Sequence, residues 1–471
     1  MPLSAQGDAV RLAVIGGGIA GLAAAWEGVQ QGAEVVVLEA GDRFGGKVTT
    51  THDDGWTVEQ GPDSFVAYRP AALALIKELG LDDQVITLQG TRQVSLRVDG
   101  RLHPLPAGMG MVLPTKLGPF VTTGILTPWD KLRAGLDLLL PRQLGAEDVA
   151  IGAFLGRRLG RGIVRKFADP MLGGIYGASV DELSLDAVLP SLRESERTHR
   201  SLMLASLAQG RAAKAPAGAG SPFRSLAGGM GQLVDVLTEA LRARGVDLRT
   251  QSPVRALERT DDTTTLHLDG GEVIAADAVI LATGPAGAAR LLSAPLPAAA
   301  AALAAIPLAT TNVVTLAYSA DAFAEPVTSH GWLEAGGAPV SGVTVSSAKW
   351  AGRAPAGDVL VRAFVPDTVG AMARASEDEV VAAVTAHVTQ NLGATRPPTR
   401  TWITRWDSLM PKFTVGHVDR VRAAEAALAP TPWRVAGSAL HGVGVPDCIA
   451  DGRLQAQAAL TQATVLHGVR R

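Results

Sequence analysis

Hydrophobic residues near the start of the chain follow a strand–helix–strand pattern. The apolar run at residues 10–15 ends in three glycines, and residues 19–31 contain good helix formers with few breakers. The next run, at residues 34–38, is β-branched and unbroken, as expected for a buried strand. Together these segments predict a βαβ unit, which occupies about thirty residues.

Later segments alternate between short apolar runs and stretches rich in breakers. Residues 56–69 are rich in turn formers, and residues 212–221 (AAKAPAGAGS) read as a flexible loop. Helices are predicted over residues 73–79, within 223–241 after a glycine turn, and from about 448 to 466. Strands are predicted at residues 278–284, 312–316, 343–345, 359–365 and 434–436. The three runs between 312 and 365 suggest a sheet separate from the first.

Composition and charge then narrow the class of protein. The chain has 471 residues, enough for two or three domains, and 43 Lys and Arg against 45 Asp and Glu give a net charge of −2. The chain has no excess of positive charge that would attract a nucleic-acid backbone, so we predict no nucleic-acid partner. A single cysteine, Cys448, excludes an intramolecular disulfide, and the nine scattered His residues lead us to predict no metal site. We see neither a signal peptide nor a long apolar run, so we predict a cytoplasmic protein without a transmembrane segment.

The glycines after the first predicted strand form the pattern Gly16-x-Gly18-x-x-Gly21. The first glycine permits a tight turn, the second lets backbone N–H groups approach a pyrophosphate, and the third allows close packing of helix and strand. Glu39 ends the next strand, 23 residues after Gly16, where a carboxylate accepts hydrogen bonds from ribose hydroxyls. A purely structural turn is the alternative, but strand, helix, second strand and acid together predict a dinucleotide site.

The block Arg43-Phe44-Gly45-Gly46-Lys47 follows this acid and helps to choose among dinucleotides. An R-x-G-G sequence at this place resembles the flavin-containing amine oxidase superfamily, where it contacts the phosphate region of the cofactor. The resemblance implies FAD rather than NAD. Cys448 lies outside the sequence context of covalent flavin attachment, so we expect non-covalent FAD and a buried, apolar thiol.

Further blocks resemble the porphyrinogen oxidases of that superfamily. They are GPDSF at 61–65, PMLGGIYG at 170–177, LAGGM at 226–230, RWDSLMPKFTVGH at 405–417 and GVGVPDCIADGRLQA at 442–456. With the first motif they run in order from residue 10 to 460. The resemblance implies an α/β fold with a discontinuous, Rossmann-like FAD/NAD(P)-binding domain (1–80, 223–300 and 406–471). A largely helical lobe facing substrate or membrane (81–222) and a mixed-sheet substrate domain (301–405) would complete it.

By similarity, Val254 would contact the adenosine half of FAD, and Trp406 with residues 444–446 would lie by the flavin ring. The predicted cofactor-binding residues are Gly16, Gly17, Gly18, Ile19, Ala20, Gly21, Glu39, Ala40, Arg43, Gly46, Lys47, Gly61, Pro62, Asp63, Ser64, Val254, Trp406, Gly444, Val445 and Pro446. The helix predicted from about residue 448, which Gly442, Gly444 and Pro446 precede, would stabilise negative charge on the reduced flavin, although a simple packing turn is the alternative.

Arg69 is the candidate contact for a substrate carboxylate, because relatives often carry a basic residue, typically lysine, at this place. A solvated surface arginine is the alternative. We name no catalytic side chain, since hydride transfer to a flavin is chemistry that the cofactor supplies.

The resemblance implies oxidation of a porphyrinogen by oxygen, with release of hydrogen peroxide, in haem synthesis. We expect coproporphyrinogen III as the preferred substrate and protoporphyrinogen IX as a slower one, since four propionates suit a cytoplasmic enzyme. A flavin amine oxidase, a carotenoid desaturase and a protein that uses its flavin only structurally are the alternatives. Residues 102–141, apolar with few basic side chains, read as a helical lobe covering the flavin or as a peripheral membrane contact; we favour the lobe. The sequence predicts no oligomeric state.

Overall fold

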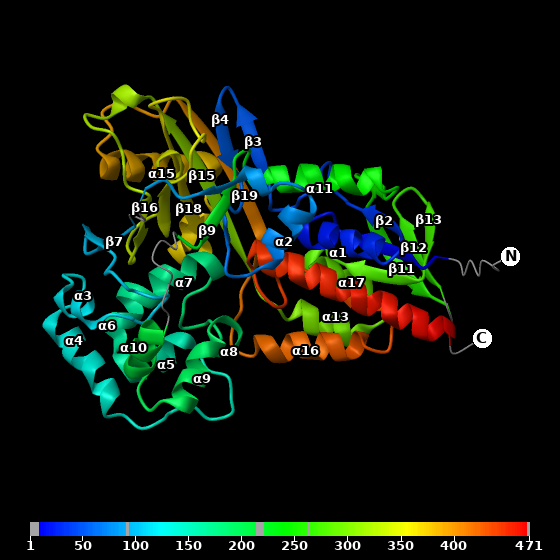
Figure 1. Ribbon diagram of the computed structural model, residues 1–471, viewed down its shortest axis with the longest axis horizontal. Helices are drawn as coiled ribbons and strands as arrows, with labels where there is room; N and C mark the ends of the chain where they lie inside the picture. Colours follow the sequence, from blue (N-terminus) through cyan, green and yellow to red (C-terminus); the bar gives the residue numbers. More distant parts are fainter. Residues whose placement is uncertain (1–8, 91–93, 213–220, 261–262, 469–471) are drawn as a thin grey trace.

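The computed structural model describes residues 9–90, 94–212, 221–260 and 263–468, and it has three parts (Figure 1). An α/β part surrounds a five-stranded sheet, a second part is a seven-stranded sheet with covering helices, and the third is a helical lobe. The predicted α/β class is confirmed. The predicted loop at residues 212–221 lies almost wholly outside the described residues.

The five-stranded sheet is parallel throughout and has the strand order β10-β2-β1-β14-β20. Its strands are β1 (Arg11–Ile15), β2 (Glu34–Leu38), β10 (Asp247–Arg249), β14 (Ala278–Leu281) and β20 (Trp433–Val435). Both faces are covered, which explains why the strands read as continuous apolar runs rather than alternating ones. The predicted βαβ unit is therefore present, with α1 (Ile19–Gln30) between β1 and β2.

Alternate residues of β1 belong to two different cores. Leu12 and Val14 pack with residues of α1, α11 (Gly231–Ala243) and α17 (Val445–Gly468). Ala13 and Ile15 point the other way, since successive side chains of a strand face opposite sides. On that side lie a small sheet of β11 (Val254–Arg259), β12 (Thr264–Leu268) and β13 (Val273–Ala276), and the helices α12 (Gly284–Leu292), α13 (Pro297–Ala304) and α16 (His417–Leu428).

The seven-stranded sheet has the order β19-β15-β18-β17-β16-β7-β8. Its strands from the middle of the chain are β15 (Leu308–Tyr318), β16 (Gly331–Glu334), β17 (Gly342–Val345), β18 (Val359–Pro366) and β19 (Arg400–Pro411). Helix α15 (Glu377–Leu392) covers one face through Val380, Val384 and Val388. The sheet that we predicted from the β-branched runs is present, and its long strand β19 carries Trp406.

Two sequence expectations need correction. Residues 95–104, assigned to the helical lobe, form β7 (Ser95–Val98) and β8 (Arg101–Pro104), because β7 pairs in parallel with β16. Residues 56–69 are not only turns. They include β4 (Trp56–Glu59), which is buried and pairs with β3 (Thr50–Asp53), and β5 (Phe65–Val66), which joins β9 (Phe223–Leu226) and β6 (Val85–Thr87) in a small sheet. Residue 406 lies inside β19, so a domain boundary there would cut a strand; the residue ranges of the domains otherwise stay a prediction.

The helical lobe has its own hydrophobic core, which includes Phe154 and Phe167. Arg158 and Asp137 form an ion pair of 2.6 Å inside it, and both side chains are fully buried. The main helices of the lobe are α3 (Leu117–Thr122), α4 (Pro128–Gly135), α5 (Ile151–Leu159), α7 (Asp169–Tyr176), α9 (Pro190–Thr198) and α10 (Leu202–Ala212). The segment at 102–141 thus contributes helices to this lobe.

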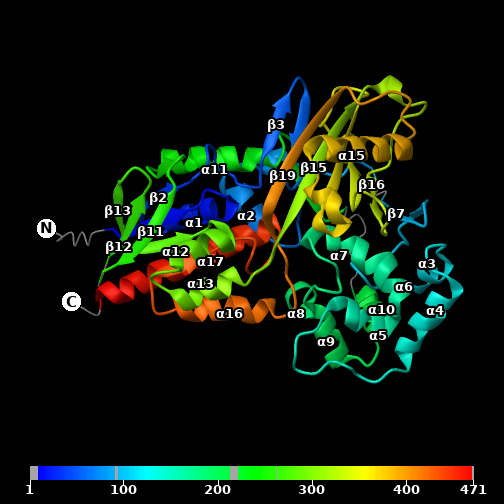
Figure 2. The same ribbon diagram turned by 180° about the vertical axis from the view of Figure 1, so that it is seen from behind.

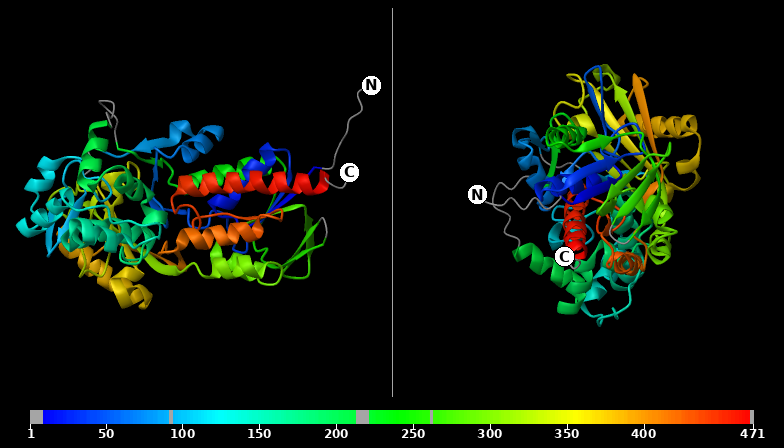
Figure 3. Two further views of the ribbon diagram at one scale, coloured as in Figure 1. Left: turned by 90° about the horizontal axis from the view of Figure 1, so that it is seen from below. Right: turned by 90° about the vertical axis from the view of Figure 1, so that its right-hand side faces the viewer.

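Helix α17 closes the α/β part against α1, and the two lie side by side in Figure 2. Figure 3 shows that the chain enters β1 and leaves α17 at the end of the molecule far from the helical lobe. The carboxyl ends of the parallel strands point the other way, toward the junction of the three parts, and in open α/β sheets ligands bind at that edge. Among the described helices, none is both long and apolar enough to cross a membrane.

Candidate functional site

The glycine turn after β1 leaves the N-terminus of α1 available to an anion. A methyl group at Gly16 would come within 2.6 Å of the Ala282 carbonyl oxygen, and one at Gly21 within 2.0 Å of the Gly16 carbonyl oxygen. These two positions therefore require glycine for close packing. Helix α1 has no side-chain cap and no acidic residue in its first turn, and Ile19 and Ala20 are buried. Because the first N–H groups of a helix have no intrahelical partner, this end fits a pyrophosphate.

Glu39 holds the turn through backbone N–H groups. Its two carboxylate oxygens accept from the N–H groups of Gly17 and Gly41, each at 2.7 Å. A carboxylate has about four acceptor sites, so capacity remains for ribose hydroxyls. The Ser252 N–H donates to the Glu39 carbonyl at 2.8 Å, which brings the start of β11, with the buried Val254, beside Glu39 and Ala40. The structure thus gathers the predicted adenosine contacts.

The R-x-G-G block folds back onto the fingerprint. The Gly45 N–H donates to the Gly17 carbonyl at 2.8 Å, and Gly46 has a left-handed φ of +56° while facing Gly18. The Arg43 guanidinium donates to the carbonyls of Phe44 and Gly46 in its own loop. Lys47 Nζ donates to the Leu409 carbonyl at 2.6 Å, and desolvation lowers the pKa of this lysine.

The segment at residues 60–64 joins the seven-stranded sheet to this site. Trp406 Nε1 donates to the Gln60 carbonyl at 3.0 Å, and a methyl group at Gly61 would come within 1.9 Å of the Lys47 carbonyl oxygen. After Pro62, Asp63 accepts from Lys349 Nζ at 2.8 Å and from Ser64 Oγ at 2.7 Å. These contacts bring Trp406 next to residues 60–64, so two groups of predicted cofactor-binding residues meet here.

A cluster of buried charges lies behind this segment, and sequence analysis missed it. Burial alone would raise the pKa of Asp63, but the positive charges of Lys349 and Arg362 outweigh it and lower that pKa. Arg362 also donates to the Gly61 carbonyl. Burial raises the pKa of Glu59, which lies 3.6 Å from the fully buried Arg353. One sequence signal was available: Arg362 interrupts the apolar strand VLVRAFV, and an arginine there needs a buried partner.

The loop before α17 is anchored at several points. The Gly437 N–H donates to Asp451 Oδ2 at 2.8 Å, and His417 Nε2 donates to the Leu440 carbonyl at 3.0 Å. His441 contacts both Asp451, at 2.9 Å, and Glu425, at 3.1 Å. Hydrogen bonds to these two carboxylates raise the pKa of His441 to about 10, so the histidine is protonated at neutral pH.

Helix α17 begins at Val445, and Gly452, about two turns later, lies against the start of α1. A methyl group at Gly452 would come within 2.1 Å of the Ala20 carbonyl oxygen, so the two helices cross in direct contact. This crossing brings Gly444, Val445 and Pro446 toward the fingerprint. Burial raises the pKa of the Cys448 thiol to about 12, as expected for an unreactive buried cysteine.

Arg69 lies between β5 and α2 (Ala71–Glu78), and its guanidinium forms an ion pair with Asp447 in the first turn of α17. Half of the Arg69 side chain is exposed. The predicted substrate contact therefore lies next to residues 444–446. Asp447, which is part of a recognised sequence block, was not singled out in the sequence analysis.

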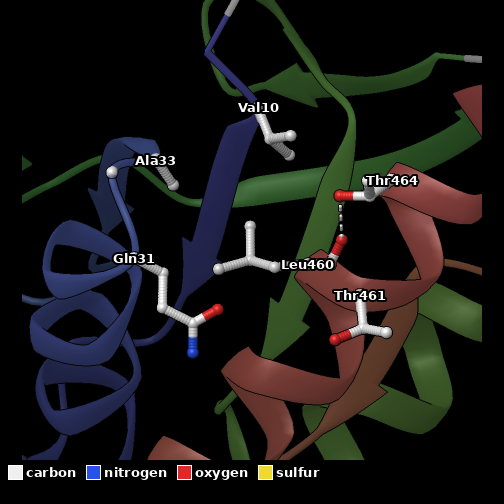
Figure 4. A pocket seen from close by; sticks show the side chains of 7 residues that line it. Val10, Gln31, Ala33, Leu460, Thr461 and Thr464 are labelled. Atoms are coloured by element: carbon white, nitrogen blue, oxygen red, sulfur yellow. Dashed lines mark hydrogen bonds between the residues drawn. The ribbon is translucent and has the colours of Figure 1, made fainter.

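Two small cavities lie elsewhere. One of about 160 Å³ lies between Val10, Ala33 and Leu460, at the amino ends of β1 and β2 (Figure 4). Another of about 200 Å³ lies in the helical lobe beside Trp129 and Arg165. The first is at the opposite end of the sheet from the fingerprint, and neither has the size of a dinucleotide site. In the described part of the chain, no group of three or more His, Cys, Asp and Glu side chains could hold a metal ion.

Known proteins resemble the chain over nearly its full length. A coproporphyrinogen III oxidase from Propionibacterium freudenreichii subsp. freudenreichii is 56% identical, over 96% of this chain and 91% of that protein. A coproporphyrinogen III oxidase from Bacillus subtilis is 32% identical over 95% of this chain and 97% of that protein. Among solved structures, one from Exiguobacterium sp. 255-15, provisionally assigned as a protoporphyrinogen oxidase, has a TM-score of 0.84 at 31% identity. It covers 96% of this chain and 99% of its own.

A putrescine oxidase bound to putrescine shares the fold at a TM-score of 0.69 and 18% identity, over 96% of this chain and 99% of that one. The family model described as flavin containing amine oxidoreductase matches residues 19–460. The match begins directly after the glycine turn and includes Glu39, the segment at 60–64 and most of α17. The expectation of FAD is confirmed, and the chain belongs to the flavin-containing amine oxidoreductase family as an FAD-dependent oxidoreductase.

Proposed function

We propose that the chain oxidises coproporphyrinogen III to coproporphyrin III, with oxygen as the final electron acceptor. Six electrons and six protons leave the substrate, and three molecules of oxygen become three of hydrogen peroxide. The observation that carries the proposal is the 56% identity, over 96% of the chain, to a coproporphyrinogen III oxidase. Relatives with the same name at 32% and 29% identity support it.

In this proposal, the residues of the chain bind the cofactor and the substrate and orient them relative to each other. The uncapped N-terminus of α1 takes the pyrophosphate, and Glu39 accepts hydrogen bonds from the ribose. The N-terminus of α17 favours negative charge near residues 444–446. When bound, FAD supplies two-electron oxidation and reaction with oxygen. Arg69 binds a propionate of the substrate, because a guanidinium matches a carboxylate in both charge and geometry.

Protoporphyrinogen IX is the second candidate substrate. A bovine protoporphyrinogen oxidase is 30% identical over 93% of this chain and 96% of that protein, which supports it at lower similarity. Protoporphyrinogen lacks two of the four propionates, so a site adapted to four carboxylates discriminates against it by leaving cations without partners. An amine oxidase has in its favour the family, which takes in amine oxidoreductases, and the fold that the chain shares with putrescine oxidase at 18% identity.

Oxygen uptake and porphyrin fluorescence test the proposal with three substrates: coproporphyrinogen III, protoporphyrinogen IX and a panel of amines. We expect the highest kcat/KM with coproporphyrinogen III, three hydrogen peroxide molecules per porphyrin, and FAD released into the supernatant by acid. A preference for protoporphyrinogen would overturn the substrate assignment. Turnover of amines without oxidation of either porphyrinogen would overturn the proposal as a whole.

A further inference from the structure

The ion pair between Arg69 and Asp447 joins two parts of the chain that are 378 residues apart. Arg69 follows the short strand β5, and Asp447 belongs to the first turn of α17. The pair is asymmetric in exposure: 50% of the Arg69 side chain is accessible, but only 18% of the Asp447 side chain. Water and ligands can therefore reach the arginine much more readily than the aspartate.

The Asp447 carboxylate is held by the shape of the preceding loop. A methyl group at Gly442 would come within 2.7 Å of the Asp447 carboxylate, and one at Gly444 within 2.9 Å of its Oδ2 atom. The loop thus leaves room for this carboxylate by having no side chain at two positions. The Asp447 carboxylate therefore packs against the backbone of this loop and also contacts Arg69.

Arg69, in contrast, uses only part of its donor capacity. A guanidinium has five N–H donors, and among the described residues only Asp447 accepts from the Arg69 side chain. Tyr176 is near enough to interact electrostatically with Arg69, and its ring packs against Phe413, with ring centroids 5.5 Å apart. The remaining donors of Arg69 thus belong to a half-exposed side chain.

We propose that Asp447 is a positioning residue that fixes Arg69 so that its remaining N–H donors receive a propionate of the porphyrinogen. This inference rests on the proposed function. A long arginine side chain loses much rotamer freedom when it binds a carboxylate, and a partner that already holds it removes that cost from substrate binding. Asp447 also repels the incoming carboxylate, but water around the half-exposed arginine screens that repulsion.

The position of Asp447 gives the arrangement a second consequence. Asp447 directly follows residues 444–446, which we predict to lie by the flavin ring. The first turn of α17 thus positions both residues 444–446 and, through Asp447, the guanidinium of Arg69. A propionate bound to Arg69 would therefore be bound close to the predicted flavin contacts.

The first test is Asp447→Asn, which keeps the side-chain shape and removes the charge. We expect the KM for coproporphyrinogen III to rise about tenfold while kcat stays within about twofold, because substrate binding rather than chemistry is weakened. Asp181→Asn is the matched control, since it breaks the exposed Arg161–Asp181 pair in the helical lobe and should leave both constants unchanged. An unchanged or lowered KM in Asp447→Asn would overturn the inference.

Two further variants separate positioning from general damage. Gly442→Ala retains Asp447 but places a methyl group against its carboxylate, so we expect the same rise in KM. In an Arg69→Ala background, Asp447→Asn should add nothing, because the aspartate acts through the arginine. An equal further rise in that background would overturn the inference.

A binding titration makes the test independent of turnover. We use coproporphyrin III, with four free carboxylates, and its tetramethyl ester as probes for the FAD-loaded protein. Asp447→Asn should weaken binding of the acid about tenfold and leave binding of the ester unchanged. If wild-type protein oxidises no porphyrinogen, the proposed function fails. If wild-type protein turns over normally and both probes weaken equally in the variant, the positioning role alone fails.

Discussion

The nucleotide half and the substrate half of the site are built in different ways. The nucleotide half comes mainly from residues 11–47, and its main contacts join backbone N–H groups to one carboxylate, Glu39. The other half, which we call the substrate half because it contains the proposed substrate contact Arg69, also includes Asp63 and the buried charges around it. It joins distant residues through side chains: Lys349 and Asp63 are 286 positions apart, and Arg69 and Asp447 are 378 apart. Local backbone geometry thus determines the first half, whereas the second exists only when the whole chain is folded.

The largest effect that we predict comes from removing one of the buried charges around Asp63. Arg362→Met should lower the free energy of unfolding by about 3–5 kcal/mol, because it leaves the buried Asp63 carboxylate without one of its two cations. Urea denaturation of the FAD-loaded protein measures this loss. Arg374→Met is the control, since Arg374 pairs with Asp367 at 3.2 Å but is 63% exposed, and its loss should cost at most about 1 kcal/mol. Equal losses in the two variants would contradict the contrast between the halves.

A second prediction concerns the nucleotide half. Glu39→Ala should weaken FAD binding roughly ten- to hundredfold, because hydrogen bonds to a charged group contribute ~1.5–3 kcal/mol. Folding should change less, because Gly41 is exposed and water can replace Glu39 at one of the two N–H groups. Titration of the apoprotein with FAD measures the affinity, and Glu34→Ala is the control, since Glu34 is an exposed glutamate at the start of β2, the strand that Glu39 follows. Unchanged affinity would show that Glu39 does not contact the ribose.

The smallest predicted effect is a pH-dependent contribution of His441 to the stability of the protein. His441 lies in the loop before α17. The pKa of His441 is raised to about 10, above the value near 6.5 of an unfolded chain. Its contribution to stability is therefore complete below pH ~6.5 and is lost as the pH rises to about 10. His441→Gln should cost about 1 kcal/mol at pH 6, a small value because the side chain is 45% exposed.

Melting temperatures of wild-type protein and His441→Gln from pH 6 to 11 test this expectation. The two curves should converge above pH 10, where the wild-type histidine is neutral as well. A difference that stays constant across this range would indicate that the histidine acts through packing rather than charge.

The same contrast explains what the sequence could predict. The strand–helix–strand unit, the glycine turn and Glu39 lie within forty residues, so periodicity and spacing were sufficient. The pairing of β7 with β16 was missed, because it joins positions such as Ser95 and Trp332 and no local pattern indicates a distant strand partner. Arg362 and Asp447 were missed for a similar reason, since the importance of each comes from a partner brought near by folding.

The order of strands in the five-stranded sheet has a consequence for biosynthesis. Strands β1 and β2 are made first, but β14 and β20, which complete the sheet, and α17, which covers it, come hundreds of residues later. At 5–20 residues per second, a ribosome needs roughly 12–49 s to travel the 243 residues from the end of β2 to the end of β14. During that interval the apolar edge of β1 has no strand beside it. An uncovered strand edge favours aggregation, so the nascent chain is most exposed to it before β14 is made. Residues 444–446, the predicted flavin contacts, follow only near the end of synthesis.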